Sequence, residues 1–179
     1  MKGIIFNITE NFITETYGED TFDEITAKCQ LITKEPFVAP GTYPDEDLLE
    51  IVGKSCDHLN ENLPTFLRKL GKYAFFQLAG AYPAFVKGFS HPKDFLKTVD
   101  SIIHVEIRKL YRDSYLPEFV YQEPDPSTLI ISYYSKRKLY DLMEGLIEGV
   151  GEYFNHHIAQ SRELKTVEDR EICDYYLTF

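Results

Sequence analysis

Two groups of residues in this chain could together hold a ligand. His104 lies in the middle of the segment 95–111, and a neutral imidazole can bind a metal ion through one ring nitrogen while a hydrogen bond fixes the other. About thirty residues later, Tyr133, Ser135 and Arg137 form the pattern Y-x-S-x-R. A guanidinium binds a carboxylate through two parallel hydrogen bonds, and hydroxyls can add further ones. Together the two groups predict a ligand that carries a metal ion and carboxylates, as heme does.

Taken separately, each group also has an ordinary explanation. His104 has Asp100 four residues before it and Arg108 four residues after it. The strongest apolar stripe of this segment runs beside the histidine, through Leu96, Val99, Ile103, Ile107 and Leu110. A single histidine on such a helix is more often structural than a ligand. In a strand the Tyr and Ser of the second motif share a face, and the Arg follows them if the extension continues, but the motif alone also fits an ordinary strand end with an exposed tyrosine and arginine.

The composition fits one folded domain. Hydrophobic residues make up 44% of the 179 residues, and the aromatic residues are thirteen Tyr and thirteen Phe without Trp. A chain of this length can bury a substantial core. The aromatic excess indicates either an aromatic core or a pocket for a flat apolar ligand. We expect a single domain over residues 1–179.

Charge and cysteine content restrict the partners and the compartment. The formal net charge of −10 disfavours nucleic acid, whose binding depends on Lys and Arg at the phosphates, and also disfavours anionic lipid. The N-terminal segment is too polar for a signal peptide or a membrane span. The three cysteines, Cys29, Cys56 and Cys173, are widely spaced and form no C-x-x-C pair. We therefore expect a cytoplasmic protein with free thiols.

The hydrophobic pattern predicts an α+β fold in which helices come first and a small antiparallel sheet follows. Helices are expected at 3–17, 21–29, 45–59, 64–80, 83–89, 92–111 and 138–154. Strands are expected at 118–122 and 128–135, with a last hairpin at 158–164 and 171–179. The helix 138–154 is then an insertion into a sheet of about four strands.

Nearly the whole chain resembles the heme-nitric oxide/oxygen-binding (H-NOX) family, the bacterial relatives of the heme domain of soluble guanylate cyclase. The resemblance rests on an ordered set of residues: the opening MKGIIFN, Gly71 in the fourth helix, His104, Pro117, the Y-x-S-x-R motif and the helix after it. Each short motif is weakly specific by itself, whereas the set in this order is specific.

The resemblance implies a non-covalently bound heme b between two lobes, with ferrous iron in the sensing state. His104 would be the proximal iron ligand, and Pro117 would press on the porphyrin and distort it. The heme propionates would be held by Tyr133, Ser135 and Arg137. Gly71 would be a hinge between a helical distal lobe, at about 1–62, and a proximal lobe, at about 63–179, that contains the sheet.

The distal residues bear on which gas binds. Family members that hold oxygen resemble one another in a distal Tyr five residues after the Arg of the motif, and Leu142 occupies that position here. Tyr140 should point elsewhere on its helix, and the supporting Trp and Asn of oxygen binders are replaced by Thr9 and Ala74. An apolar pocket is expected from Ile5, Leu78, Leu142 and Leu146. Without a hydrogen-bond donor, such a pocket should favour NO and CO over oxygen.

The resemblance therefore implies a gas sensor in which NO weakens the His104–iron bond and the lobes shift. The chain has no kinase, cyclase or phosphodiesterase motif and no motif of a hydrolase or phosphate loop, so we expect no enzymatic activity. The output would pass to a separate histidine kinase or cyclic-di-GMP enzyme. Three alternatives stay open: an oxygen sensor or carrier of the same family, an enzyme that uses heme or no heme, and an interaction module without cofactor. The interaction module would purify colourless, whereas a heme protein is red.

Overall fold

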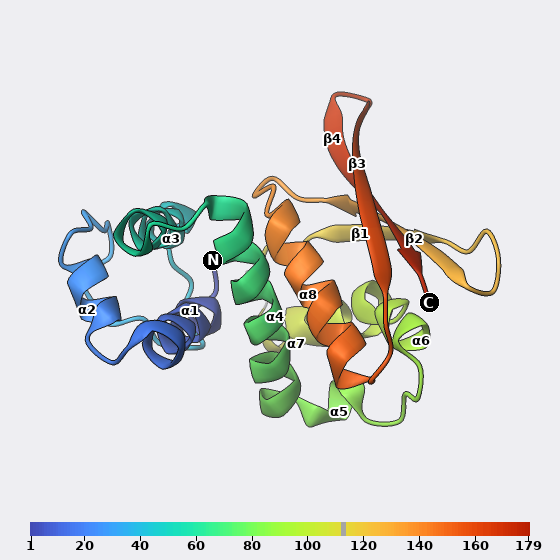
Figure 1. Cartoon of the computed structure of the whole chain (residues 1–179), viewed down its shortest axis with the longest axis horizontal. Coiled ribbons are helices and arrows are strands. Elements are labelled where there is room, and N and C mark those ends of the chain that lie inside the picture. Colours follow the sequence, from blue (N-terminus) through green and yellow to red (C-terminus); the bar gives the residue numbers. More distant parts are fainter. Residues whose placement is uncertain (112–113) are drawn as a thin grey trace.

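Three helices at one end of the molecule form a lobe with its own apolar core (Figure 1). The computed structural model describes residues 1–111 and 114–179, and these helices are α1 (Gly3–Tyr17), α2 (Thr21–Thr26) and α3 (Asp45–Leu59). Their apolar residues recur at helical spacing, so each helix turns one face inward. The N-terminal half of α4 (Leu63–Ala81) closes this core, which includes Phe6, Phe12, Ile13, Ile51 and Phe66.

Helix α4 is shared between two cores. It begins close to the predicted residue because the Asn62 side chain accepts a hydrogen bond from the Thr65 amide (2.9 Å) and Pro64 occupies the first turn. Its C-terminal half leaves the first core, and Phe75 and Ala79 join a second core formed with the sheet. The change from one core to the other falls inside α4. The predicted division of the lobes near residues 62 and 63 stays a prediction.

The second core lies under a four-stranded antiparallel sheet. Its strands are β1 (Glu118–Gln122), β2 (Thr128–Tyr134), β3 (Ala159–Val167) and β4 (Arg170–Thr178), in the order β1-β2-β4-β3. Helix α8 (Tyr140–Tyr153) connects β2 to β3, and the β3–β4 hairpin projects beyond the rest of the sheet (Figure 1). This arrangement confirms the predicted α+β fold with an inserted helix.

The pairing register sets which side chains of β2 face the core. Alternate residues of β2 are buried, and Tyr133 is the last of them within the strand. Its partner on β4 is Cys173, which is also buried, and the preceding inward pair is Ile131 with Tyr175. A slip of one residue would turn all of these side chains to solvent, so burial of this face fixes the register. The register thereby places Tyr133 on the inner side of the sheet.

Helices α4 and α8 pack backbone against backbone through glycines. A Cβ atom at Gly71 would collide with the carbonyl oxygen of Leu142 in α8, and one at Gly145 would collide with that of Arg68 in α4. Gly149 makes a third close approach, to the Cβ of Phe75. At these positions only a residue without a side chain lets the helices come so close. Gly71 is thus a close-packing point in the middle of a continuous helix, and its role as a hinge stays a prediction.

The single helix predicted over 92–111 is wrong, because the structure divides this segment. After the short α5 (Pro83–Val86) it contains α6 (Pro92–Leu96), a π-helical turn η1 (Val99–Ile103) and α7 (His104–Leu110). The hydroxyl of Thr98 donates to the Phe95 carbonyl (2.7 Å), and such a side-chain bond competes with the backbone hydrogen bonds of a helix. The His104 amide then bonds to the carbonyl of Val99, five residues back. His104 is therefore the first residue of α7, directly after a π-helical turn.

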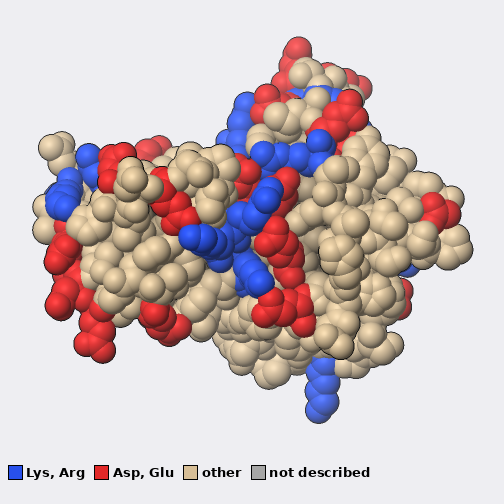
Figure 2. Space-filling view, viewed as in Figure 1, with Lys and Arg blue, Asp and Glu red and all other residues tan. Residues whose placement is uncertain are grey.

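Negative charge is concentrated on the helical lobe. Residues 1–62 carry four basic and thirteen acidic side chains, a net charge of −9 out of the −10 of the chain. Figure 2 shows acidic groups over this lobe and a basic group where α4 meets α8, beside further acids. There Arg68 pairs with Glu144, and Lys72 pairs with Glu152 (2.5 Å). Such a surface disfavours nucleic acid and anionic lipid. No helix among the described residues has the length and apolar character needed to cross a bilayer.

Candidate ligand-binding cavity

A cavity of about 490 Å³ lies between the two halves of the molecule. Helices α1, α4 and α8 provide one wall, and α6, η1, α7 and β1 provide another. The structure brings nine of the ten predicted site residues to this cavity: Ile5, Leu78, His104, Pro117, Tyr133, Ser135, Arg137, Leu142 and Leu146. Gly71 alone lies outside the lining. Most of the lining is apolar, as is usual for cavities that bind organic ligands and cofactors.

His104 is held in one orientation at the wall of this cavity. Its side chain is buried, its Nδ1 lies 3.2 Å from the Asp100 carboxylate, and its ring stacks on Phe119 with 5.3 Å between centroids. No described residue forms a hydrogen bond with Nε2. Burial lowers the pKa of His104 below its usual value, and the Asp100 carboxylate offsets only part of that shift. The imidazole is therefore neutral near pH 7, with Nε2 available as a metal ligand.

Tyr133 and Ser135 are buried at the other motif, but Arg137 does not continue the strand as predicted. Strand β2 ends at Tyr134, and a turn follows in which the Lys138 amide bonds to the Ser135 carbonyl (3.2 Å). The Ser135 hydroxyl accepts from the Arg137 amide (3.2 Å), which favours the turn. The turn returns Arg137 to the cavity. Burial raises the pKa of Tyr133, so its phenol stays protonated and can donate to a carboxylate.

The Arg137 guanidinium is anchored by a residue that the sequence did not indicate. Its Nε and Nη2 donate to the two carboxylate oxygens of Asp45 in α3 (2.7 and 3.0 Å), and its Nη1 donates to the Tyr115 carbonyl (2.7 Å). Asp45 also accepts from the N-terminal ammonium of Met1 (2.5 Å). A guanidinium has five N–H groups, so two remain for a ligand. The bonds between Arg137 and Asp45 link the turn after β2 to helix α3 of the helical lobe.

We expect Asp45→Asn to lower the free energy of unfolding at pH 7 by about 1 kcal/mol. The expected loss is small because the Asp45 side chain is about one-third exposed, and solvent screens an ion pair at such a position. Burial by itself would raise the pKa of Asp45, but hydrogen bonds from Arg137 and the N-terminus outweigh it and hold the pKa below its usual value. A lowered carboxyl pKa adds stability above the unfolded pKa, and that stability disappears as the pH falls through the folded pKa. Urea unfolding at several pH values should show the two proteins converging below about pH 4; a constant difference would contradict this linkage.

The wall opposite His104 is apolar where gas discrimination was predicted. Ile5, Leu78, Leu142 and Leu146 line it, whereas Thr9 and Ala74 lie outside the lining. The Thr9 hydroxyl donates to the Ile5 carbonyl within α1 (2.8 Å). Tyr140 points away, as predicted, because its hydroxyl donates to Glu171 (2.6 Å).

Tyr82, at the end of α4, is a phenol in this lining that the sequence did not indicate. Its oxygen lies 3.4 Å from the hydroxyl of Tyr111, which follows α7. No motif marks this residue, since it comes after the last predicted turn of its helix. It adds one polar group to the part of the cavity formed by α4.

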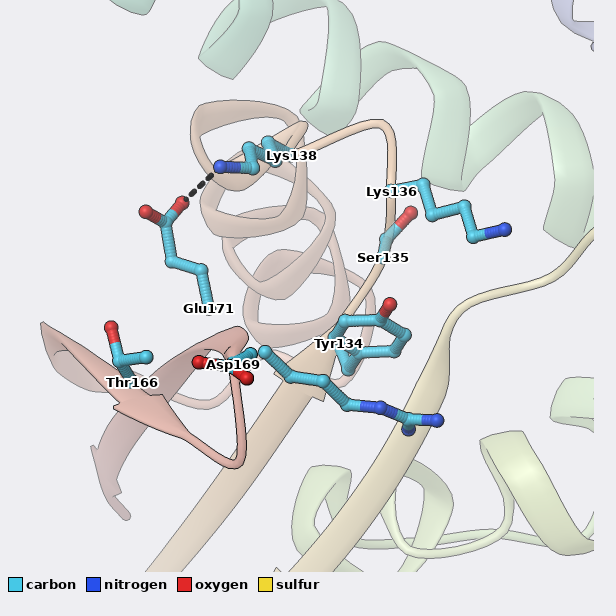
Figure 3. Close-up of a pocket in the computed structure, with 8 residues that line it drawn as sticks. Tyr134, Ser135, Lys136, Lys138, Thr166, Asp169 and Glu171 are labelled. Carbon is cyan, nitrogen blue, oxygen red and sulfur yellow. Dashed lines mark ion pairs between the residues drawn. The ribbon is translucent and has the colours of Figure 1, made fainter.

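A second, open groove lies on the outer side of the Y-x-S-x-R turn (Figure 3). Tyr134, Lys136 and Lys138 line it, and Lys138 pairs with Glu171 of β4 (3.0 Å). Ser135 borders both the groove and the inner cavity. The alternation of the strand end therefore sends Tyr133 inward and Tyr134 outward. The groove is polar with mixed charge, so it does not suit a flat apolar cofactor.

The residues of the inner cavity fit heme. A flat macrocycle requires extended apolar walls, an iron ligand requires a neutral imidazole with an open nitrogen, and two propionates require donors at one edge. His104 supplies the imidazole, while Tyr133, Ser135 and Arg137 supply hydroxyl and guanidinium donors that line the same cavity. The arrangement can bind a diatomic gas on the side of the apolar residues Ile5, Leu78, Leu142 and Leu146.

Comparison with known proteins points to the same ligand. A family model described as Haem-NO-binding matches residues 2–162. The structure of an H-NOX protein from S. oneidensis in the Fe(II)NO ligation state is similar, with 26% identity, a TM-score of 0.89 and 100% of both chains covered. An A71G mutant of the K. algicida H-NOX protein, Fe(II) and unliganded, is 26% identical, with a TM-score of 0.86 over 99% of this chain and 96% of that one. The I5F mutant of T. tengcongensis H-NOX shares the fold, with 21% identity, a TM-score of 0.89 and coverages of 100% and 97%.

Proposed function

The chain belongs to the Haem-NO-binding (H-NOX) family, and on that premise we propose that it senses nitric oxide through a ferrous, non-covalently bound heme b. As a member of this family it is a heme-binding gas sensor and not an enzyme. Bound heme supplies an iron with an open coordination position at which a diatomic gas binds. We place the iron at His104, the propionates at Tyr133, Ser135 and Arg137, and Pro117 against the porphyrin.

One observation carries the proposal. The open Nε2 of His104 and the donors of the Y-x-S-x-R motif line one largely apolar cavity, although the sequence separates them by about thirty residues. The Phe119 ring packs against both His104 and Tyr133, with 5.3 and 5.7 Å between ring centroids. Each group alone has an ordinary structural explanation. Their convergence on one cavity matches a ligand with a central metal and peripheral carboxylates, which a cofactor-free interaction module does not require.

The signal would leave through the segment that holds His104. Asp100 in the π-helical turn η1 binds Nδ1, so movement of the imidazole would pull on this turn. Helix α6 is fixed, because the buried ammonium of Lys93 donates to the carbonyls of Asp125 and Pro126 (3.1 and 2.9 Å). We propose that NO loosens His104 from the iron and lets α7 move relative to α6. A separate signalling protein, of the histidine kinase or cyclic-di-GMP enzyme class, would respond to that movement.

We expect the unaltered protein to bind NO and CO and to form no stable complex with oxygen, because polar bound oxygen needs a hydrogen-bond donor. Leu142→Tyr should place a phenol in the apolar wall and raise oxygen affinity by about tenfold, the effect of a hydrogen bond worth about 1.4 kcal/mol. The measurement is an oxygen titration of the reduced protein followed by absorption. Leu142→Phe is the control, since it adds the ring without the hydroxyl.

Oxygen binding by the unaltered protein would contradict this part of the proposal and favour an oxygen sensor. Tyr82 would then be the residue to test, because it is a phenol in the part of the cavity formed by α4. Loss of oxygen binding in Tyr82→Phe would identify it as the donor. On the present proposal, the oxygen affinity of Tyr82→Phe equals that of the parent.

A further inference from the structure

We propose that Ser114 is a further member of the carboxylate clamp and donates its hydroxyl to a heme propionate. The inference rests on the proposed heme binding and adds a residue outside the Y-x-S-x-R motif. Ser114 lies in the segment between α7 and β1, three residues before Pro117, and it lines the cavity. It would act as a positioning residue for the heme.

The Ser114 hydroxyl has a property that points to a ligand. Its Oγ is shielded from solvent and has no hydrogen-bond partner among the described residues. A buried hydroxyl without a partner is unfavourable, and most buried polar groups in folded proteins are paired. The amide of Ser114 is satisfied, since it donates to the Tyr111 carbonyl (3.0 Å). The hydroxyl is thus a group without a partner among the described residues, on a residue that lines the cavity.

The position of Ser114 identifies the chemistry of that ligand. The next residue, Tyr115, accepts from Arg137 Nη1 through its carbonyl (2.7 Å) and holds the guanidinium 4.8 Å from its ring centroid. Its hydroxyl accepts from the Lys136 amide (2.9 Å), so the segment supports the turn of the clamp. Ser114 thus directly precedes the residue that holds the Arg137 guanidinium, and Ser114, Tyr115 and Arg137 all line the cavity. A carboxylate drawn to Arg137 can accept from a hydroxyl there, and bonds to charged acceptors are the stronger ones.

The test compares heme loss from the full chain with two forms of the cofactor. Protoheme carries free propionates, whereas protoheme dimethyl ester carries the same ring without negative charge. The loss rate is measured as transfer to excess apomyoglobin, for the parent, Ser114→Ala and Ser114→Thr. We expect Ser114→Ala to lose protoheme about tenfold faster, as for a lost hydrogen bond to a charged group, and to lose the ester at the parental rate. Ser114→Thr, which keeps the hydroxyl, should stay close to the parent.

A second measurement separates ligand binding from folding. Thermal unfolding of the apo-protein should give an unchanged or raised midpoint for Ser114→Ala, because the substitution removes an unpaired buried hydroxyl. Ser127→Ala is the matched control: that hydroxyl donates to Asp125 in the β1–β2 turn (2.7 Å), outside the cavity, and its loss should leave heme transfer unchanged.

The outcomes distinguish the two proposals. Equal acceleration of protoheme and ester loss, or a lowered apo-protein midpoint, would show a structural role and overturn the inference about Ser114. An unchanged protoheme rate in Ser114→Ala would also overturn it while leaving heme binding intact. Failure of the parent to take up protoheme would instead overturn the proposed function.

Discussion

His104→Ala is expected to abolish proximal ligation and to weaken heme retention by more than about 100-fold, since loss of a supporting partner alone costs 10–100-fold in metal affinity. The physical reason is that His104 is the histidine of the cavity lining and has its Nε2 open. The measurement is the absorption spectrum of the reduced protein during titration with heme. Added imidazole should restore a histidine-like spectrum, because the substitution leaves room for the free ring beside Asp100.

His157→Ala is the matched control for this prediction. His157 is exposed in the connection between α8 and β3 and lies outside the cavity, so its loss should leave the titration unchanged. A His104→Ala protein with the parental spectrum and heme affinity would remove His104 from the proposed site. Rescue by imidazole in His104→Ala, with no effect of imidazole on the control, would identify the position of the iron.

Gly71→Ala should lower the free energy of unfolding by about 2–3 kcal/mol, the upper part of the range for overpacking a tight interface. The added Cβ would meet the Leu142 carbonyl, and backbone atoms cannot rotate away as a flexible side chain can. Helix α8 must then move, and with it Leu142 and Leu146 of the cavity wall. Urea unfolding measures the stability, and the heme-loss rate reports the displaced wall.

Gly80→Ala tests the same substitution in the same helix without the collision. A Cβ at Gly80 meets nothing within 4 Å, so the alanine should stabilise the protein by up to about 1 kcal/mol through helix propensity. Comparing Gly71→Ala with Gly80→Ala also tests the predicted hinge at Gly71. If Gly71→Ala unfolds like the parent and only its gas response changes, then flexibility at residue 71 matters and close packing does not.

Elements whose apolar residues repeat on one face could be predicted closely from the sequence. Helices α1 and α3 and strand β2 follow this rule, because the repeat reflects the side of each element that is buried. The break at η1 could not be predicted in this way. A π-helical turn adds one residue to a helix without changing its composition, and here it depends on the Thr98 hydroxyl and on the anchoring of α6 through Lys93.

The site, too, has residues whose positions could be predicted from the sequence and residues whose positions could not. Strand alternation was sufficient to place Tyr133 inside, and the ordered motifs were sufficient to group it with His104. The turn that brings Arg137 back, and its pairing with Asp45, depend on tertiary contacts between residues 92 positions apart. Ser114 likewise carries no signal in the sequence, since its property is the absence of a partner for its hydroxyl among the described residues.

The most direct test of the account is the anaerobic absorption spectrum of the reduced, heme-loaded protein before and after addition of NO, followed by exposure of a separate sample to air. We predict a five-coordinate, histidine-ligated spectrum that changes with NO to one without the histidine ligand, and no stable oxygen complex in air. A six-coordinate NO spectrum that persists would contradict the release of His104 as the signal. Absence of heme uptake would contradict the central claim that this cavity is a heme site.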